Sequence, residues 1–150
     1  RLGRVPEAVD CYVAAIAEAG WSGAWTAQAV ALRRLAVMYH QRNEHAAARQ
    51  TCRTSFDVAL QAGDPVLAAE ALHTLAGFEL ECGNLGTARD AYRQALTLGG
   101  ESEILRARIE QSLGVLADVQ SDFVGALEHH QRSLDGFQEP ALVPAGRAAA

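Results

Sequence analysis

The chain has 150 residues, of which 49% are apolar and 21% charged, so it can bury the core of one ordinary domain. Its net charge of −5 disfavours nucleic-acid binding, because affinity for a phosphate backbone requires a basic face. All 13 basic residues are arginine, so the lysine that a phosphate loop or a Schiff-base enzyme requires is absent.

The apolar segments and the cysteines of the sequence indicate the cellular compartment of the protein. No run reaches the roughly 20 apolar residues of a membrane span, and no basic-then-apolar leader opens the chain. The three cysteines, Cys11, Cys52 and Cys82, are an odd number without paired spacing, which argues against a disulfide framework. We therefore expect a cytoplasmic protein without membrane contact, whose thiols are free and mostly buried.

Helical periodicity recurs along the whole chain, and no useful length alternates with a period of two, so an all-α fold is predicted. Breaks are expected at Gly20, at Gly63 to Pro65, and at Gly99 with Gly100, with Pro65 well placed near a helix start. The predicted helices cover residues 5–19, 24–42, 44–62, 65–82, 85–98, 102–119 and 122–137.

The pattern repeats itself. A small residue recurs at Ala8, Ala48, Ala88 and Ala126, at spacings of 40, 40 and 38. Positions four, seven and eight residues later match as well, and these offsets lie on one helical face. Each pair of helices has a turn residue between its members, at Gly3, Asn43, Gly83 and Ser121. The alanine column is expected where the two helices of a pair approach closely.

Residues 69–98, AEALHTLAGFELECGNLGTARDAYRQALTL, resemble a tetratricopeptide repeat (TPR). The matching positions are Leu75, Ala76, Gly83, Ala88, Tyr92 and Ala95. The chain departs from the family in its period of 38 to 40 rather than about 34, in having no closing proline, and in having Glu79 where an aromatic is usual. Long repeats of this kind are typical of large bacterial regulators.

The resemblance implies a right-handed α-solenoid of antiparallel helix hairpins, with about three and a half repeats. The TPR-like domain would cover residues 1–137, as a half repeat over 1–20 and repeats over 24–62, 65–98 and 102–137. Residues 138–150 would be a tail or the start of a further repeat. The first helix carries Val9, Val13 and Ile16 without an upstream neighbour to cover them all, so exposed solenoid ends could self-associate.

By the same resemblance, the function would be to bind a protein or peptide in the concave groove of the superhelix. Carried over by offset, the groove residues are Val30, Arg33, Val37, His40, Glu70, His73, Leu80, Arg108, Gln111, Val115 and Asp118. Arg33, His73 and Gln111 hold equivalent positions and would form a ladder of polar contacts. Arg49 and Arg89, on second helices, would lie on the outer surface.

Two alternatives to a peptide-binding groove remain. The same face could be a solvated surface on a structural spacer. The chain could also be the sensor or regulatory region of a larger bacterial signalling ATPase or transcription activator, since long-period arrays occur in such proteins.

Catalytic and metal-binding constellations are not evident in the sequence. His40 and His45 lie on either side of the Asn43 turn, and none of the five histidines has ligand spacing, so we expect no metal or cofactor. No histidine stands at a helical offset that would activate a thiol. The chain is therefore predicted not to be an enzyme.

Acidic and aromatic pairs have plain explanations too. Glu79 with Glu81, and Glu101 with Glu103, face different ways on a helix and fit a solvated surface better than acid and base catalysis. Trp21 and Trp25, one turn apart at the start of a first helix, could form an aromatic platform. Packing against the preceding hairpin is the favoured interpretation.

Overall fold

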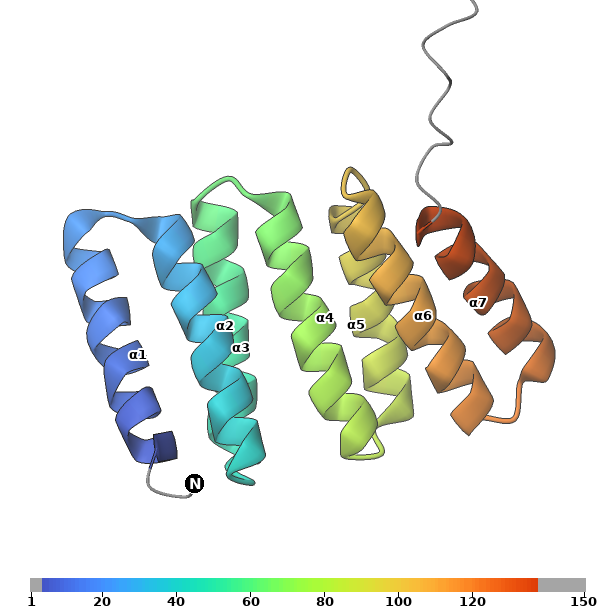
Figure 1. Ribbon diagram of the computed structural model, residues 1–150, viewed down its shortest axis with the longest axis horizontal. Helices are drawn as coiled ribbons and strands as arrows, with labels where there is room; N and C mark the ends of the chain where they lie inside the picture. Colours follow the sequence, from blue (N-terminus) through green and yellow to red (C-terminus); the bar gives the residue numbers. More distant parts are fainter. Residues whose placement is uncertain (1–3, 138–150) are drawn as a thin grey trace, which may run out of the picture. The chain divides into compact units, whose positions relative to one another are not determined.

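The structure, a computed structural model, describes residues 4–137; the predictions for Gly3 and for residues 138–150 lie outside the described residues. The described part contains seven helices and no strand, and it belongs to the all-α class (Figure 1). In chain order the helices are α1 (Arg4–Ser22), α2 (Trp25–Gln41), α3 (His45–Gln61), α4 (Pro65–Glu81), α5 (Leu85–Leu98), α6 (Glu103–Val119) and α7 (Phe123–Phe137).

Six of the seven predicted helices agree with the observed ones to within about one residue at either end. The exception is α1, which continues through Gly20 to Ser22. The prediction of a break at Gly20 is wrong because the chain turns at Gly23, whose φ of 70° is the left-handed conformation that ends a helix. Gly20 instead faces α2, where an added Cβ would lie 3.1 Å from Gln28 Nε2.

Within each of the remaining helix pairs, the second helix begins at a fixed interval after the first. The starting residues of α2 and α3 are Trp25 and His45, those of α4 and α5 are Pro65 and Leu85, and those of α6 and α7 are Glu103 and Phe123, in each case 20 residues apart. The turns match as well, because Asn43, Gly83 and Ser121 have positive φ angles of 61°, 80° and 60°. The three predicted turn positions within the described residues are thus confirmed.

The contacts divide the chain after Glu101 into two compact units. The first unit holds α1 to α5, and α4 is central to it because α4 packs against α2, α3 and α5. The second unit consists of α6 packed on α7. Within each pair, α2 with α3, α4 with α5 and α6 with α7, the two helices pack against one another.

The core of the first unit combines alanines with larger apolar side chains where helices meet. Ala29, Leu32, Val58 and Leu67 form one buried cluster, and Ala36, Ala48, Cys52 and Phe78 form another. A hydrogen bond closes the α2–α3 contact, where the Ser55 hydroxyl donates to the carbonyl of Ala29 at 2.7 Å. The second unit repeats it, since the Ser133 hydroxyl donates to the carbonyl of Ala107 at 2.8 Å. Both buried hydroxyls are therefore satisfied in the same way.

The cysteines differ from the expectation that most are buried. Cys52 is buried and its thiol donates to the carbonyl of Ala71 at 3.1 Å, whereas Cys11 and Cys82 are exposed. Burial raises the pKa of the Cys52 thiol to about 12. Cys52 therefore acts as a small packing residue between α3 and α4.

Glu79 is not on a solvated face, so that interpretation was wrong. It is 4% exposed in α4, and its Oε1 accepts a hydrogen bond from Arg49 Nε at 2.6 Å. Its Oε2 accepts from Asn84 Nδ2 at 2.6 Å. Because α4 is covered on several sides, the carboxylate reaches α3 and the turn before α5 rather than solvent. Arg49 is half-buried in this contact rather than fully solvated.

The ion pair sets the ionisation of both partners. Burial opposes the charge on Glu79, but the hydrogen bonds from Arg49 and Asn84 outweigh it, so the pKa of Glu79 is lowered. The hydrogen bond to Glu79 raises the pKa of Arg49. The charged pair is therefore the stable form of this contact at neutral pH.

Replacing Ala88 by leucine tests the close approach of α4 and α5. Ala88 has no exposed surface, so Ala88→Leu should overpack the contact and cost about 1 to 3 kcal/mol of unfolding free energy, measured by denaturant titration. Arg93→Ala, an exposed change on the same helix, should cost much less. Equal losses would mean that Ala88 does not lie at the helix crossing.

Acid titration of stability tests the Glu79 contact. Because the folded-state pKa of Glu79 is lowered, its contribution is present above the unfolded value near 4.5 and is lost as the pH falls through the folded pKa. Glu79→Gln should therefore be less stable than the wild type at neutral pH, and the gap should narrow in thermal melts recorded at successively lower pH below that value. Glu18→Gln, an exposed change, is the control. A gap that does not depend on pH would show that the charge contributes nothing.

Candidate functional site

Two of the predicted groove residues, Arg33 on α2 and Glu70 on α4, form an ion pair with 3.2 Å between Arg33 Nη2 and Glu70 Oε2. Their side chains are 25% and 29% exposed, so both are partly shielded from water and partly accessible. The pair bridges the two first helices of the first unit. It places a charged, partly desolvated group where α2 and α4 lie next to one another.

His40 lies about two helical turns after Arg33 on α2, in a second polar cluster. Its ring stacks on Phe78 of α4, with ring centres 4.3 Å apart and planes inclined by 13°. Its Nε2 lies 2.5 Å from Oε2 of Glu81, also on α4. The stacking and the carboxylate together hold the imidazole in one orientation.

His45 joins this cluster from the first turn of α3. Its Nδ1 lies 3.4 Å from Nδ1 of His40, although the two residues are separated by the turn at Asn43. Both histidines line an open cavity of about 600 Å³, together with Val37, Phe78 and Cys82. The floor of the cavity is thus apolar, and its walls carry imidazole, carboxylate and thiol groups.

The other predicted residues of the first unit lie closer to the core. Val30 packs against the cluster around Leu32, and Val37 against the cluster around Phe78. His73 is half-buried with its ring tilted against Tyr92 of α5, at 5.5 Å between ring centres. Leu80 is half-buried near the end of α4. The structure therefore joins Arg33 to Glu70 directly, while it turns His73 towards its own partner helix.

The predicted residues of the second unit are more open. Arg108, Gln111 and Val115 are exposed on α6. Asp118 pairs with His130 of α7, with 3.1 Å between Oδ2 and Nε2. The place of Gln111 in the ladder with Arg33 and His73 stays a prediction.

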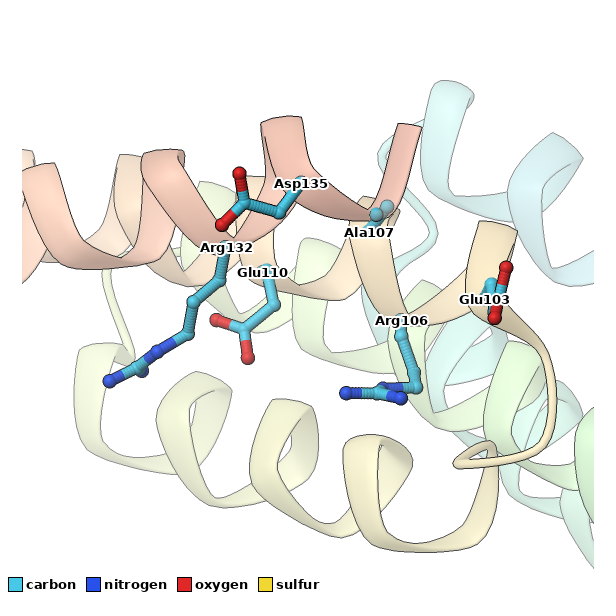
Figure 2. A pocket seen from close by; sticks show the side chains of 7 residues that line it. Glu103, Arg106, Ala107, Glu110, Arg132 and Asp135 are labelled. Atoms are coloured by element: carbon cyan, nitrogen blue, oxygen red, sulfur yellow. The ribbon is translucent and has the colours of Figure 1, made fainter. Parts of the chain in front are cut away.

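The second unit also has a pocket that the sequence pattern did not indicate. It measures about 440 Å³, and the charged residues that line it are Glu103, Arg106, Glu110, Arg132 and Asp135 (Figure 2). Glu110 is already bound to His129, with 2.6 Å between Oε2 and Nδ1. The lining has two arginines and three carboxylates, so the charges nearly balance. The pocket therefore has no strong preference for an ion of either sign.

The two tryptophans do not pack as predicted. Trp21 lies at the end of α1 and is 92% exposed, and Trp25, at the start of α2, is exposed as well. They belong to different helices because the chain turns at Gly23 between them. Packing against a preceding hairpin is therefore wrong for Trp21.

Sequence reasoning missed His45, Phe78 and Glu81 as members of the His40 cluster. Phe78 and Glu81 lie on α4, about 40 residues from His40, and no local pattern links them. A signal did exist for His45, because a three-residue turn brings the end of one helix and the start of the next together. The described residues contain no group of three or more side chains arranged to hold a metal ion.

None of the described helices is both long and apolar enough to cross a membrane. No protein-family model and no curated protein matches the chain.

A solved structure does resemble the chain. The crystal structure of BtubC (BKLC) from P. vanneervenii matches it with a TM-score of 0.80 and 19% sequence identity. The match covers 89% of this chain and 57% of BtubC, so the chain spans little more than half the length of that protein. At this identity the likeness establishes that the two proteins share a helical fold, and nothing further.

Proposed function

We propose that this chain is a non-catalytic scaffold that binds a protein or peptide. In this proposal it is a TPR-like, right-handed solenoid of antiparallel helix hairpins, and its first helices line the binding groove. The observation that carries the proposal is the half-buried ion pair of Arg33 and Glu70, which joins two successive first helices.

The constant spacing of the helices supports the repeat. In each of three pairs the second helix begins 20 residues after the first, and the intervening turn has a residue of positive φ. Residues related by such a repeat stack side by side in a solenoid, so an extended segment could contact several first helices at once.

The chemistry of the Arg33 pair suits a peptide backbone or carboxylate. A guanidinium has five N–H donors in a planar fork, and the contact with Glu70 is made through Nη2. Because both side chains are partly shielded from water, a new hydrogen bond there gains more than it would on an open surface. Val37, one helical turn after Arg33 on α2, lines the neighbouring cavity around His40 and would add apolar contact.

Selection from a phage-displayed peptide library, followed by Kd measurement on the selected peptide, tests the proposal. Arg33→Ala combined with His73→Ala should raise the Kd about 10- to 100-fold, as expected for the loss of a charge-assisted hydrogen bond. The Arg33 change should lower the melting temperature only slightly because its ion pair is partly exposed, whereas the His73 change also removes a ring contact with Tyr92.

Arg53→Ala combined with Arg93→Ala is the matched control. These exposed arginines hold equivalent positions on α3 and α5, whereas Arg49 is unsuitable because it binds Glu79. If the control pair loses affinity and the groove pair does not, the peptide binds the second helices. If no peptide is enriched, the spacer interpretation replaces the proposed groove.

A further inference from the structure

His40 and His45 approach one another through the same ring nitrogen. Their Nδ1 atoms are 3.4 Å apart, and their ring centres are 5.1 Å apart with planes inclined by 63°. Hydrogen bonds donated by N–H groups in proteins usually span about 2.7 to 3.2 Å. A direct hydrogen bond between the two imidazoles would therefore be long and weak.

The same separation fits a shared ligand. Imidazole nitrogens bind zinc at about 2.0 to 2.1 Å, so two of them on one tetrahedral ion lie about 3.3 to 3.4 Å apart. The ring centres are then about 5 Å apart, since each ring centre lies about 1 Å behind its nitrogen. Both observed separations agree with one ion held between the two Nδ1 atoms.

The surroundings of His40 prepare its Nδ1 for such a bond. Glu81 Oε2 lies 2.5 Å from His40 Nε2, so the carboxylate can accept the Nε2 proton. In that tautomer Nδ1 carries no proton, so its lone pair is available at the ring atom that lies 3.4 Å from His45 Nδ1. Histidines that bind metals commonly donate their other N–H to a carboxylate, and the stacking on Phe78 fixes the ring further.

We propose that His40 and His45 bind one divalent transition-metal ion through their Nδ1 atoms, with Glu81 as the positioning residue. Imidazole ligands suit zinc, copper and nickel rather than magnesium or calcium. The remaining coordination positions face the open cavity, where water can fill them and where Cys82 also lies. The proposal does not rest on the proposed function, and it departs from the expectation that these histidines lack ligand spacing.

Two protein ligands bind less tightly than the four of a structural zinc site, so the ion is not required for folding. The described residues contain no group of three or more His, Cys, Asp or Glu side chains that could hold a metal ion, so the proposed site has two protein ligands only. Metal should therefore bind to the folded protein and leave its helix content unchanged.

A calorimetric titration tests the proposal, with Zn²⁺ added to the untagged protein after treatment with a chelator. One ion per chain is expected, and Co²⁺ in its place should give the strong visible absorption of tetrahedral coordination. His45→Ala and His40→Ala should each lower the affinity about 10- to 100-fold or more, and Glu81→Gln should lower it about 10-fold.

His129→Ala is the matched control. His129 is also bound to a carboxylate, that of Glu110, and its variant should bind Zn²⁺ like the wild type. Circular dichroism checks that each variant folds. If His40→Ala does not fold, the test is decided by His45→Ala, because His45 is only half-buried. The proposal is overturned if Zn²⁺ does not bind, or if the folded His45→Ala protein binds it as tightly as the wild type.

Discussion

The close approach of helix backbones at alanine positions is the constraint on which the rest of the first unit depends. The alanines there with no exposed surface are Ala29, Ala36, Ala48, Ala59, Ala68, Ala69, Ala71, Ala76, Ala88 and Ala95. A larger side chain at such a crossing would push the helices apart, because packed interiors have little room to relax. Close approach allows Ser55 to reach the carbonyl of Ala29 and Cys52 to reach that of Ala71. The polar pairs between helices depend on the same short distances.

Glu79 shows what central burial does to a charged residue. Glu79 lies where α4 is covered by α3 and α5. The glutamate is stable there because Arg49 and Asn84 supply hydrogen bonds to both carboxylate oxygens. Since Asn84 lies in the turn before α5, one buried carboxylate links two helices and a turn.

Equivalent positions in the repeat also host different chemistry. His40 and His45 face each other across their turn, and Leu80 with Leu85, and Asp118 with Phe123, hold the corresponding places in the other pairs. A comparable substitution occurs at Gly114, which stands where the other pairs have Ala36 and Ala76. A Cβ at Gly114 would lie 2.5 Å from the ring of His130, so the histidine can hold this position only beside a glycine. Such differences between equivalent positions change the side chains that a helix pair presents, while the 20-residue spacing between the starts of its two helices stays the same.

The seven helices of the described residues, the boundaries of six of them and the turns at Asn43, Gly83 and Ser121 could be predicted from the sequence, because helix periodicity and turn chemistry depend on neighbouring residues. The sequence also indicated the pairing of first and second helices, through the alanine column at Ala48, Ala88 and Ala126. It could not show that Arg33 binds Glu70, that Arg49 binds Glu79, or that His40 meets His45 and Glu81. Nor could it show that Trp21 is exposed. Whether a polar residue is solvated or paired depends on which helix covers it, and most of these partners are more than 25 residues apart in the chain, so only tertiary packing decided them.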